Sequence, residues 1–477
     1  MVVSEMRSAD HDRIGPFSAF RLALGILNNP FAGSEHIYRR YGRAVEFDLL
    51  ALPRHAPIKY VFLIGPDYNR EALAKSNAIR PAGLWSVKGP PGSAQRAIQD
   101  HSFLKSTGVE HDAVAEATNP ALKRTRVQGD FERAKALVED EIVNWPRDRA
   151  VDLYGLLRRL AQRVSFTLLF GESDVDRIRR FGDLAFDYHC GNWNWLAYVF
   201  PVNVKGTAYH HVLQTAERLK ALVCDWVAEG RARPGDDLVS AFARMKDGDG
   251  KALSADKILA HMLLFAVASY ETMSSATTWT LLLLMLHPEI MADLLDEISA
   301  SSAFCDIDHA GLSSLKLLDV VVKEGLRLIP PAPLFPLRVF APCEVAGRAL
   351  MPSHRIILSP CLTHRLPEIY DFPARFRPQR WFNINPSPYE YLPFSAGPRR
   401  CPGFWFGTNF MKLAIAAILS HYRLELDRRA RLDWRYTGIL APKPGGALVR
   451  VAAQDRAIRA QSAVGTILDC FERPATA

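Results

Sequence analysis

The segment FSAGPRRCPG, residues 394–403, constrains the fold more than any other part of the chain, because it places one cysteine among glycines and arginines directly before a strongly apolar helix. A lone loop cysteine is most often buried filler, and it can also be a nucleophile or a metal ligand. A nucleophile needs a positioned histidine, and the neighbouring sequence has none. An iron-bound thiolate needs backbone N–H groups and positive charge near the sulfur, which Gly397, Gly403 and Arg399 can supply. The segment therefore favours a haem ligand at Cys401.

Length and composition indicate what kind of protein this is and which partners it can have. The length of 477 residues alone favours two or three domains, and the 48% apolar content indicates a large core. Lys and Arg outnumber Asp and Glu by 59 to 51, yet no long basic run marks a surface for nucleic acid, and we expect no such partner. The seven cysteines are scattered and form no CxxC pair, which argues against a disulfide framework and a structural zinc site. These features predict a reducing, cytoplasmic compartment.

One apolar stretch, residues 258–287, is long enough to span a bilayer. His261 and Glu271 interrupt it, however, and an ionisable side chain at membrane depth costs about 3 kcal/mol. The N-terminal residues carry charges where a signal peptide needs an apolar run, and we expect no membrane anchor before the folded region. The stretch therefore predicts a long buried helix.

The pattern of apolar residues predicts a mainly α fold with small β-sheets. Residues 44–50 and 59–65 predict a hairpin followed by a short helix, and residues 150–171 repeat apolar residues at helical spacing. Helices continue to Pro330, after which frequent prolines predict short strands broken by turns. The segment 438–453, with KPGG near its centre, predicts a last hairpin.

The cysteine segment resembles the haem-binding loop of the cytochrome P450 family, F-x-x-G-x-R-x-C-x-G. The resemblance implies that Cys401 is the proximal iron ligand, that Phe394 packs beside the thiolate and that Arg399 faces a haem propionate. Gly397 and Gly403 stand at the glycine positions of the pattern. The resemblance also implies the cytochrome P450 fold, with haem b held between the long helix and the helix that follows the cysteine.

The resemblance runs from YGRAVEFDL to GGALVRV and replaces the length-based expectation of several domains. It implies a single domain over residues 16–454, with a flexible tail over residues 1–15 and an extension over residues 455–477. The spacing of apolar residues in the extension predicts an amphipathic helix that either docks onto the body or serves self-association. Its apolar face comprises Val464, Ile467, Leu468 and Phe471.

Two further segments match the family in the expected order. KEGLR places Glu324 and Arg327 on one face of a helix and resembles the E-x-x-R motif. FRPQRW supplies Arg380, which the resemblance adds to that pair as a buried triad that braces the haem loop. The stretch 363–382 resembles the family throughout the region before the haem loop.

ASYETMSS, residues 268–275, resembles the oxygen-activation signature of the family. The resemblance places Ala268 over the iron and assigns catalysis to Thr272, a hydroxyl that hydrogen-bonds dioxygen, and to Glu271, an acid connected to solvent. Apolar neighbours argue against a pair that merely faces water. Ser269 replaces the usual glycine, so it either bends the helix by bonding back to a carbonyl or adds a polar contact to the pocket.

The helix that normally gives the propionates a His or Trp and, four residues later, an Arg also departs from the family. GVEHDAVAEATNPAL supplies His111 but has Ala115 at the arginine position. The resemblance therefore assigns propionate pairing to His111, Arg338 and Arg399. The basic residues 123–124 become candidates if the alignment shifts.

The resemblance implies a monooxygenase that inserts one oxygen atom into an apolar or mixed-polarity small molecule. Electrons would come from NAD(P)H through a ferredoxin or flavodoxin with its reductase, and a bacterial role in secondary metabolism is expected. A peroxide-dependent relative is the runner-up, although such enzymes commonly replace the acid–threonine pair. A haem sensor or carrier would have no use for that pair.

The substrate itself is not readable from the chain, but candidate pocket walls are. Aromatic residues crowd segment 186–210 and predict an apolar body for the ligand, although core packing explains them equally well. The residues expected to line the pocket are Leu264, Ser269, Pro333, Leu334, Phe335 and Ile439.

Overall fold

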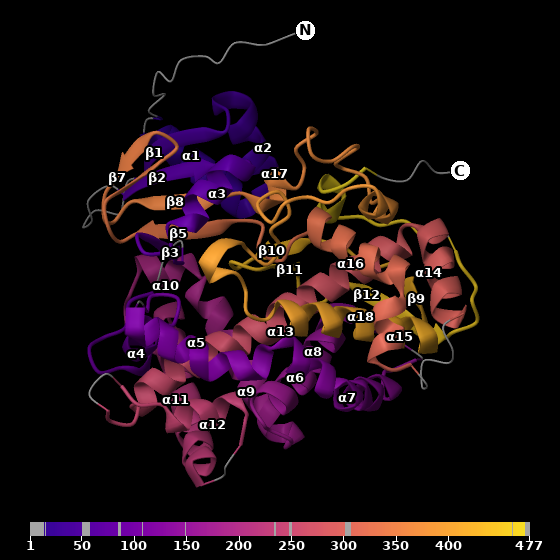
Figure 1. Ribbon diagram of the computed structural model, residues 1–477, viewed down its shortest axis with the longest axis horizontal. Coiled ribbons are helices and arrows are strands. Elements are labelled where there is room, and N and C mark those ends of the chain that lie inside the picture. The colour runs from indigo at the N-terminus through magenta and orange to yellow at the C-terminus, as the bar shows by residue number, and fades with distance from the viewer. Residues whose placement is uncertain are drawn as a thin grey trace.

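The computed structural model describes residues 14, 16–49, 58–83, 87–106, 108–147, 149–232, 235–247, 250–300, 307–459 and 461–472. The prediction of a flexible tail over residues 1–15 lies outside the described residues apart from Ile14. Figure 1 shows a large body of helices with a β-rich part at one end. The mainly α fold with small sheets is therefore confirmed.

The helices follow one another along most of the chain. They are α1 (Pro16–Asn28), α2 (Pro30–Tyr41), α3 (Pro66–Ala74), α4 (Ala94–Asp100), α5 (Gly108–Leu122), α6 (Arg124–Gly129), α7 (Phe131–Val143), α8 (Leu153–Leu169), α9 (Val175–Asn192), α10 (Trp195–Val199), α11 (Ala208–Ala232), α12 (Leu238–Arg244), α13 (Ala255–Met285), α14 (Pro288–Ala300), α15 (His309–Ser314), α16 (Lys316–Leu328), α17 (Pro360–Thr363) and α18 (Phe404–His421). Short 3-10 helices are η2 (Pro378–Phe382), η3 (Gly397–Arg399) and η4 (Thr466–Asp469).

The main sheet has the strand order β1-β2-β8-β5-β3, in which only the β2–β8 pair is parallel. Its strands are β1 (Ala44–Leu49), β2 (Ile58–Leu63), β3 (Ile79–Pro81), β5 (Phe335–Val339) and β8 (Arg355–Leu358). The remaining strands form small sheets: β4 (Ala150–Asp152), β12 (Leu448–Ala453) and β9 (Tyr422–Leu426); β6 (Cys343–Val345) and β7 (Arg348–Leu350); β10 (Trp434–Tyr436) and β11 (Leu440–Pro442). The predicted hairpin of β1 and β2 followed by a helix is confirmed.

Helix α13 forms the centre of the helical body and contacts α8, α11, α16 and α18. Ser254 caps it, since its hydroxyl accepts a hydrogen bond from Lys257 N at 3.3 Å. Every residue from 258 to 285 outside the window 264–272 is buried, which confirms the predicted long buried helix. Among the described helices none alone is long and apolar enough to cross a membrane, and only α13 and α14 together, across a bend of 110°, meet that test.

The predicted hairpin over residues 438–453 is wrong. Its first arm, β11, pairs with β10, whereas its second arm, β12, pairs with β4 and β9. Contacts with the body separate the arms, because Leu440 N donates to Pro331 O at 2.8 Å and Leu440 O accepts from Trp279 Nε1 of α13 at 3.1 Å. Tertiary hydrogen bonds therefore override the local turn signal.

The predicted amphipathic helix in the C-terminal extension is also wrong within the described residues, which hold only the 3-10 helix η4. The backbone of the extension bonds mainly to the body around η4: Leu432 N donates to Val464 O at 2.8 Å, and Ile467 N donates to Leu432 O at 3.0 Å. Ile467 and Phe471 are buried, whereas Val464 is exposed. The extension therefore packs onto the body as an irregular strap.

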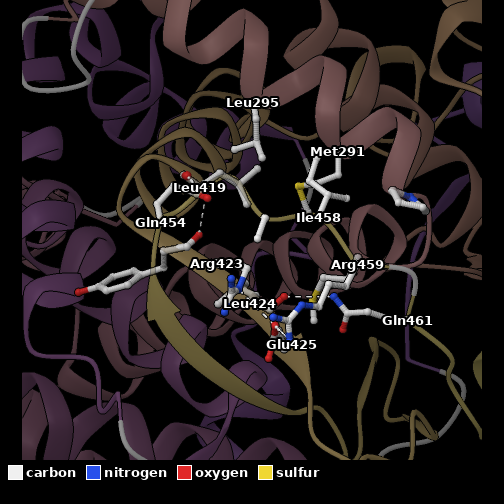
Figure 2. A pocket seen from close by; sticks show the side chains of 14 residues that line it. Met291, Leu295, Leu419, Arg423, Leu424, Glu425, Gln454, Ile458, Arg459 and Gln461 are labelled. Carbon is white, nitrogen blue, oxygen red and sulfur yellow. Dashed lines mark hydrogen bonds and ion pairs between the residues drawn. The ribbon is translucent and has the colours of Figure 1, made fainter.

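The start of this strap forms a surface pocket with β9 and α14, shown in Figure 2. Gln454 Nε2 donates to Leu419 O at 2.6 Å. Glu425 lies 3.2 Å from Arg423 and 3.4 Å from Arg459, so the charges of this pocket already pair with one another. None of the residues that the sequence predicts for the functional site lines it. The pocket therefore lies where the C-terminal strap packs against the body.

Candidate active site

The cysteine loop makes a turn that only glycine tolerates at residue 397. Gly397 has a φ of +73°, and a Cβ atom there would lie 2.8 Å from Leu73 O of α3. Cys401 N donates to Phe394 O at 2.9 Å and closes the loop. The Phe394 ring meets the Phe404 ring edge-on, with 4.9 Å between centroids. The loop therefore fixes the cysteine directly before α18.

The pKa of the Cys401 thiol is raised on balance, although two neighbours act to stabilise the thiolate. The residue as a whole is exposed, but protein atoms crowd the sulfur, and this desolvation raises the pKa of the thiol. The backbone N–H of Gly403 donates toward the sulfur, and this bond and the charge of Arg400 act in the opposite direction. A thiolate is the form that binds iron, and N–H groups aimed at the sulfur stabilise it.

Helix α13 passes close to this loop. Gly407 of α18 lies between the two, since a Cβ atom built on it would be 3.7 Å from the Phe394 ring and 3.8 Å from the Met273 side chain. Met273 directly follows Thr272 in the sequence. The cysteine loop and the accessible window of α13 are therefore neighbours.

The accessible window of α13 carries Ala268 at its centre. Ala268 is exposed, and Leu264, Ser269 and Thr272 are partly accessible, in a helix that is otherwise buried. Ser269 Oγ donates to Ala266 O at 2.8 Å, and Thr272 Oγ1 donates to Ala268 O at 2.9 Å. Ser269 thus bonds back to its own helix, which is the first of the two arrangements expected from its sequence position.

Glu271 points away from this window. It is fully buried, and its Oε1 accepts from the Tyr154 hydroxyl of α8 and from Arg435 Nη2 of β10 at 3.0 Å. Its Oε2 is buried without a hydrogen-bond partner. Burial raises the pKa of the Glu271 carboxyl above its ordinary value, and Arg435 and Tyr154 offset part of that effect. Arg435 thus holds the Glu271 carboxylate in the core, and the role of this residue as an acid connected to solvent stays a prediction.

Sequence reasoning missed the partners of Glu271. Arg435 Nη2 also bonds to the Tyr154 hydroxyl at 3.2 Å, its Nη1 lies 2.8 Å from Cys190 Sγ, and its guanidinium lies 4.6 Å from the Phe186 ring centre. These residues come from separate parts of the chain and match no linear motif. A lone arginine in the short β10 strand was the only signal.

The structure brings Glu324, Arg327 and Arg380 together in a fully satisfied cluster. Glu324 Oε2 lies 2.8 Å from Arg327 Nε, and Glu324 Oε1 lies 3.0 Å from Arg380 Nε. Trp381 Nε1 and Arg377 N each donate to the same carboxylate at 2.9 Å. Burial acts to raise the pKa of Glu324, but Arg327 and Arg380 outweigh it and hold this pKa below its ordinary value. The carboxylate is therefore ionised in the core.

A row of cationic side chains crosses the main sheet. Arg355 of β8 stands opposite Arg338 of β5, and Arg338 stands opposite Arg80 of β3. Arg399 of the cysteine loop donates to Ser106 O at 3.0 Å, next to Lys105, whose carbonyl accepts from Arg80 Nη1 at 3.0 Å. Of these arginines, only Arg338 and Arg399 were predicted from the sequence.

The predicted propionate residue His111 lies beside the window of α13. Its ring stacks on Phe103 with 4.9 Å between centroids, and Phe103 in turn contacts Phe265 of α13 at 5.6 Å. Arg124, the alternative candidate, lies instead over the Trp405 ring of α18 at 4.9 Å. His111 is therefore the better placed of the two.

The predicted pocket residues do not all share one surface. Pro333 and Leu334 are buried. Phe335 packs on the cluster that lies on the opposite face of the sheet from Arg338, because neighbouring strand residues alternate between faces. Ile439 lies in a turn whose neighbouring Gly438 approaches Trp193 of the aromatic segment. Leu264, Ser269 and Ile439 thus remain as candidate walls.

These donors fit a haem. The site offers one cysteine with an N–H group at its sulfur, an accessible and mostly apolar face on α13, and guanidinium groups for two carboxylates. Buried nitrogen atoms without a hydrogen-bond partner include Arg80 Nε, Arg338 Nε and two atoms of Arg355. Such orphaned donors mark a place where an anionic group belongs.

Comparisons with known proteins agree with this site. Residues 146–449 match the family cytochrome P450. Putative cytochrome P450 139 of Mycobacterium tuberculosis is 26% identical over 406 residues, covering 81% of this chain and 91% of that protein. Cyclooctatin synthase of Streptomyces melanosporofaciens is 26% identical over 369 residues, covering 72% and 77%. The structure of retinoic acid bound cyanobacterial CYP120A1 has the same fold, with a TM-score of 0.75 at 21% identity over 90% of this chain and 96% of that chain. This chain belongs to the cytochrome P450 family of haem-dependent monooxygenases.

Proposed function

We propose that this protein oxidises a largely apolar small molecule with one atom of dioxygen. The electrons come from NAD(P)H and are carried by a separate ferredoxin or flavodoxin with its reductase. The observation that carries the proposal is the juxtaposition of the Cys401 loop with the accessible window of α13 around Ala268 and Thr272. Haem b, when bound at Cys401, supplies the oxygen-activating chemistry.

Thr272 is the proton-handling hydroxyl of the window. Its Oγ1 donates to Ala268 O at 2.9 Å, and the hydroxyl oxygen keeps acceptor capacity on its accessible side. A hydroxyl in this state accepts a proton from one neighbour while passing its own to another. Thr272 can therefore orient a ligand and relay a proton at the same face.

Glu271 stores the proton one residue away. Its buried carboxyl has a raised pKa, so the protonated form persists to a higher pH than in a solvent-exposed Glu. Arg435 and Tyr154 hold this carboxyl in the core in the present conformation. The Glu271 side chain must therefore move away from Arg435 before it can deliver its proton to Thr272.

The walls of the window support an apolar substrate. On α13 the apolar Leu264 and Phe265 are partly accessible, as are the polar Ser269 and Thr272, and Ile439 is partly accessible in the turn before β11. Among the similar proteins are a cyclooctatin synthase and a structure with bound retinoic acid, a molecule whose body is largely hydrocarbon. We place the reaction in bacterial secondary metabolism and in the cytoplasm, where the free thiols of the described cysteines, such as Cys190 and Cys361, stay reduced.

The test compares Thr272→Ala with Thr277→Ala, which removes a hydroxyl of the same helix that is buried and bonded to Met273 O at 2.8 Å. With NAD(P)H and surrogate redox partners, we expect Thr272→Ala to form product about 10-fold or more slowly and to release more hydrogen peroxide per NAD(P)H consumed. Thr277→Ala keeps the wild-type ratio of product to peroxide. If peroxide alone drives the wild type faster than the redox system does, the dioxygen proposal is wrong.

A further inference from the structure

Tyr154 of α8 is a buried phenol whose own chemistry the proposed reaction does not use. Its side chain is 2% exposed, and its hydroxyl donates a hydrogen bond to Glu271 Oε1. Arg435 Nη2 donates to the same hydroxyl oxygen at 3.2 Å. The phenol proton therefore points at a carboxylate.

This acceptor distinguishes Tyr154 from other buried tyrosines of the protein. The hydroxyls of Tyr209, Tyr270 and Tyr422 donate to backbone carbonyls, those of Lys88, Gly182 and Ile142. An ionised carboxylate can take up a proton, whereas a backbone carbonyl only accepts a hydrogen bond. Arg435, which lies 3.0 Å from Glu271 Oε1, favours the ionised form of that carboxyl.

A proton acceptor decides which buried ring can lose an electron. A phenol that loses an electron and keeps its proton becomes a cation, and an uncompensated cation inside a protein is costly. If the proton moves to a neighbouring carboxylate at the same time, the ring becomes a neutral radical. Tyr154 meets this condition through Glu271, and the phenols that donate to carbonyls do not.

Tyr154 is also close to the haem side of α13. Helix α8 packs against α13, and the phenol contacts the residue directly before Thr272 of the accessible window. A helix with its side chains is about 10–12 Å across. The phenol is therefore separated from the window by no more than the width of one helix.

We propose that Tyr154 gives one electron to a haem that hydrogen peroxide has oxidised, while Glu271 accepts the phenol proton. Peroxide is reduced as it removes two electrons from the haem, and Tyr154 returns one of the two. The O–H bond of the phenol breaks, its electron passes to the haem, and its proton forms an O–H bond with Glu271 Oε1. The inference goes beyond the proposed function, because it concerns turnover that yields peroxide instead of product. Tyr154 then protects the haem from that peroxide.

The experiment mixes haem-loaded, substrate-free protein with hydrogen peroxide, freezes it rapidly and records the electron paramagnetic resonance spectrum. Ring-deuterated tyrosine incorporated into the protein narrows the signal of a tyrosyl radical and so assigns it. We expect a tyrosyl radical in the wild type. We expect Tyr154→Phe to lower the radical formed per oxidised haem by about 10-fold or more, since the remaining phenols would have to form buried cations.

Two further variants separate the phenol from its proton acceptor. Tyr270→Phe removes a phenol of α13 that is also buried and that donates to Gly182 O at 3.4 Å, and it keeps the radical yield within about 2-fold. Glu271→Gln keeps a hydrogen-bond acceptor for Tyr154 but cannot take up its proton, so it loses the radical as Tyr154→Phe does. Yields are compared per oxidised haem, so a variant that contains less haem can still be compared.

Three outcomes of this measurement overturn the proposal. The wild type forms no tyrosyl radical, or Tyr154→Phe forms as much as the wild type, and then Tyr154 is not the electron donor. Alternatively, the radical is lost in Tyr154→Phe but kept in Glu271→Gln, and then the carboxylate is not the proton acceptor.

The protective role has its own readout, the loss of Soret absorbance during repeated additions of peroxide. We expect this loss to be about 2-fold faster in Tyr154→Phe than in Tyr270→Phe, because the oxidised haem persists longer without its electron donor. Equal rates in the two variants overturn the protective role.

Discussion

The Glu324 triad is a buried cluster of charge and the arginine row is a partly buried one, and the two are built in opposite ways. In the triad, one carboxylate receives two arginines and two neutral donors within 3.0 Å, and every charge has a partner. In the row, Arg80, Arg338 and Arg355 face one another across the sheet, and buried nitrogen atoms of each lack an acceptor. The fold completes the first cluster and leaves the second incomplete.

This difference separates structural charge from functional charge. A buried ion pair with satisfied hydrogen bonds stabilises one arrangement of the core and needs nothing further. A buried set of like charges costs stability, so its presence indicates a ligand that offsets the cost. The triad braces the segment before the cysteine loop, and the row belongs to the site. The comparison predicts effects of opposite sign when one charge is removed from each cluster.

The largest effect is expected for Glu324→Gln. The substitution leaves Arg327 and Arg380 buried without an anion, and we expect the free energy of unfolding to decrease by about 3–5 kcal/mol. Glu35→Gln removes one partner of the exposed Arg39–Glu35 pair and changes stability by less than about 0.5 kcal/mol. Denaturant unfolding followed by circular dichroism measures both. A loss for Glu324→Gln no greater than that of the control would contradict a structural role for the triad.

The sequence predicted the triad and missed most of the row for a physical reason. Glu324 and Arg327 are three residues apart, so helical geometry places them on one face, and the family resemblance of KEGLR and FRPQRW supplied their burial and the third member, Arg380. Arg80, Arg338 and Arg355 become neighbours only through strand register, which depends on pairing between distant segments. The same limit explains Glu271, whose partner Arg435 lies in a strand far along the chain.

The two wrong predictions near the C-terminus, the hairpin and the amphipathic helix, have a related cause. The KPGG turn locally favours a hairpin, and the apolar spacing of the extension locally favours a helix. Hydrogen bonds with the body at Leu440 and Leu432 determine a different structure in each case. By contrast, the long helix and the cysteine loop were predictable, because burial and backbone conformation at Gly397 depend on the local sequence. Local patterns therefore identify the parts of the site and not their partners.

An intermediate effect is expected for the pH dependence of His364, which lies against the triad. Its Nε2 accepts from Leu392 N at 3.0 Å, and burial together with the charge of Arg327 lowers the pKa of His364 to about 3. The unfolded chain binds a proton near pH 6.5, whereas the folded protein does not until about pH 3. The neutral imidazole therefore contributes stability above pH 6.5, and this contribution is lost progressively as the pH decreases toward 3.

The variant His364→Gln tests this directly, since its amide oxygen can still accept a hydrogen bond and does not titrate. We expect the wild type to lose about 2 kcal/mol more than the variant between pH 7.5 and pH 5. Other histidines with lowered pKa values, such as His189 and His261, are present in both proteins and cancel in the difference. Parallel pH profiles of the two proteins would show that His364 titrates normally.

The smallest effect, and the one with the opposite sign, is expected for Arg355→Gln. Removing this cation relieves its repulsion with Arg338, so the free energy of unfolding should stay unchanged or increase by up to about 1 kcal/mol at low ionic strength. Salt screens such repulsion, and any gain should decrease as salt is added. Denaturant unfolding at low and high salt measures the change. A loss of stability in Arg355→Gln that approaches the loss in Glu324→Gln would show that the row, like the triad, is complete within the chain, and would remove the reason to expect an anionic ligand there.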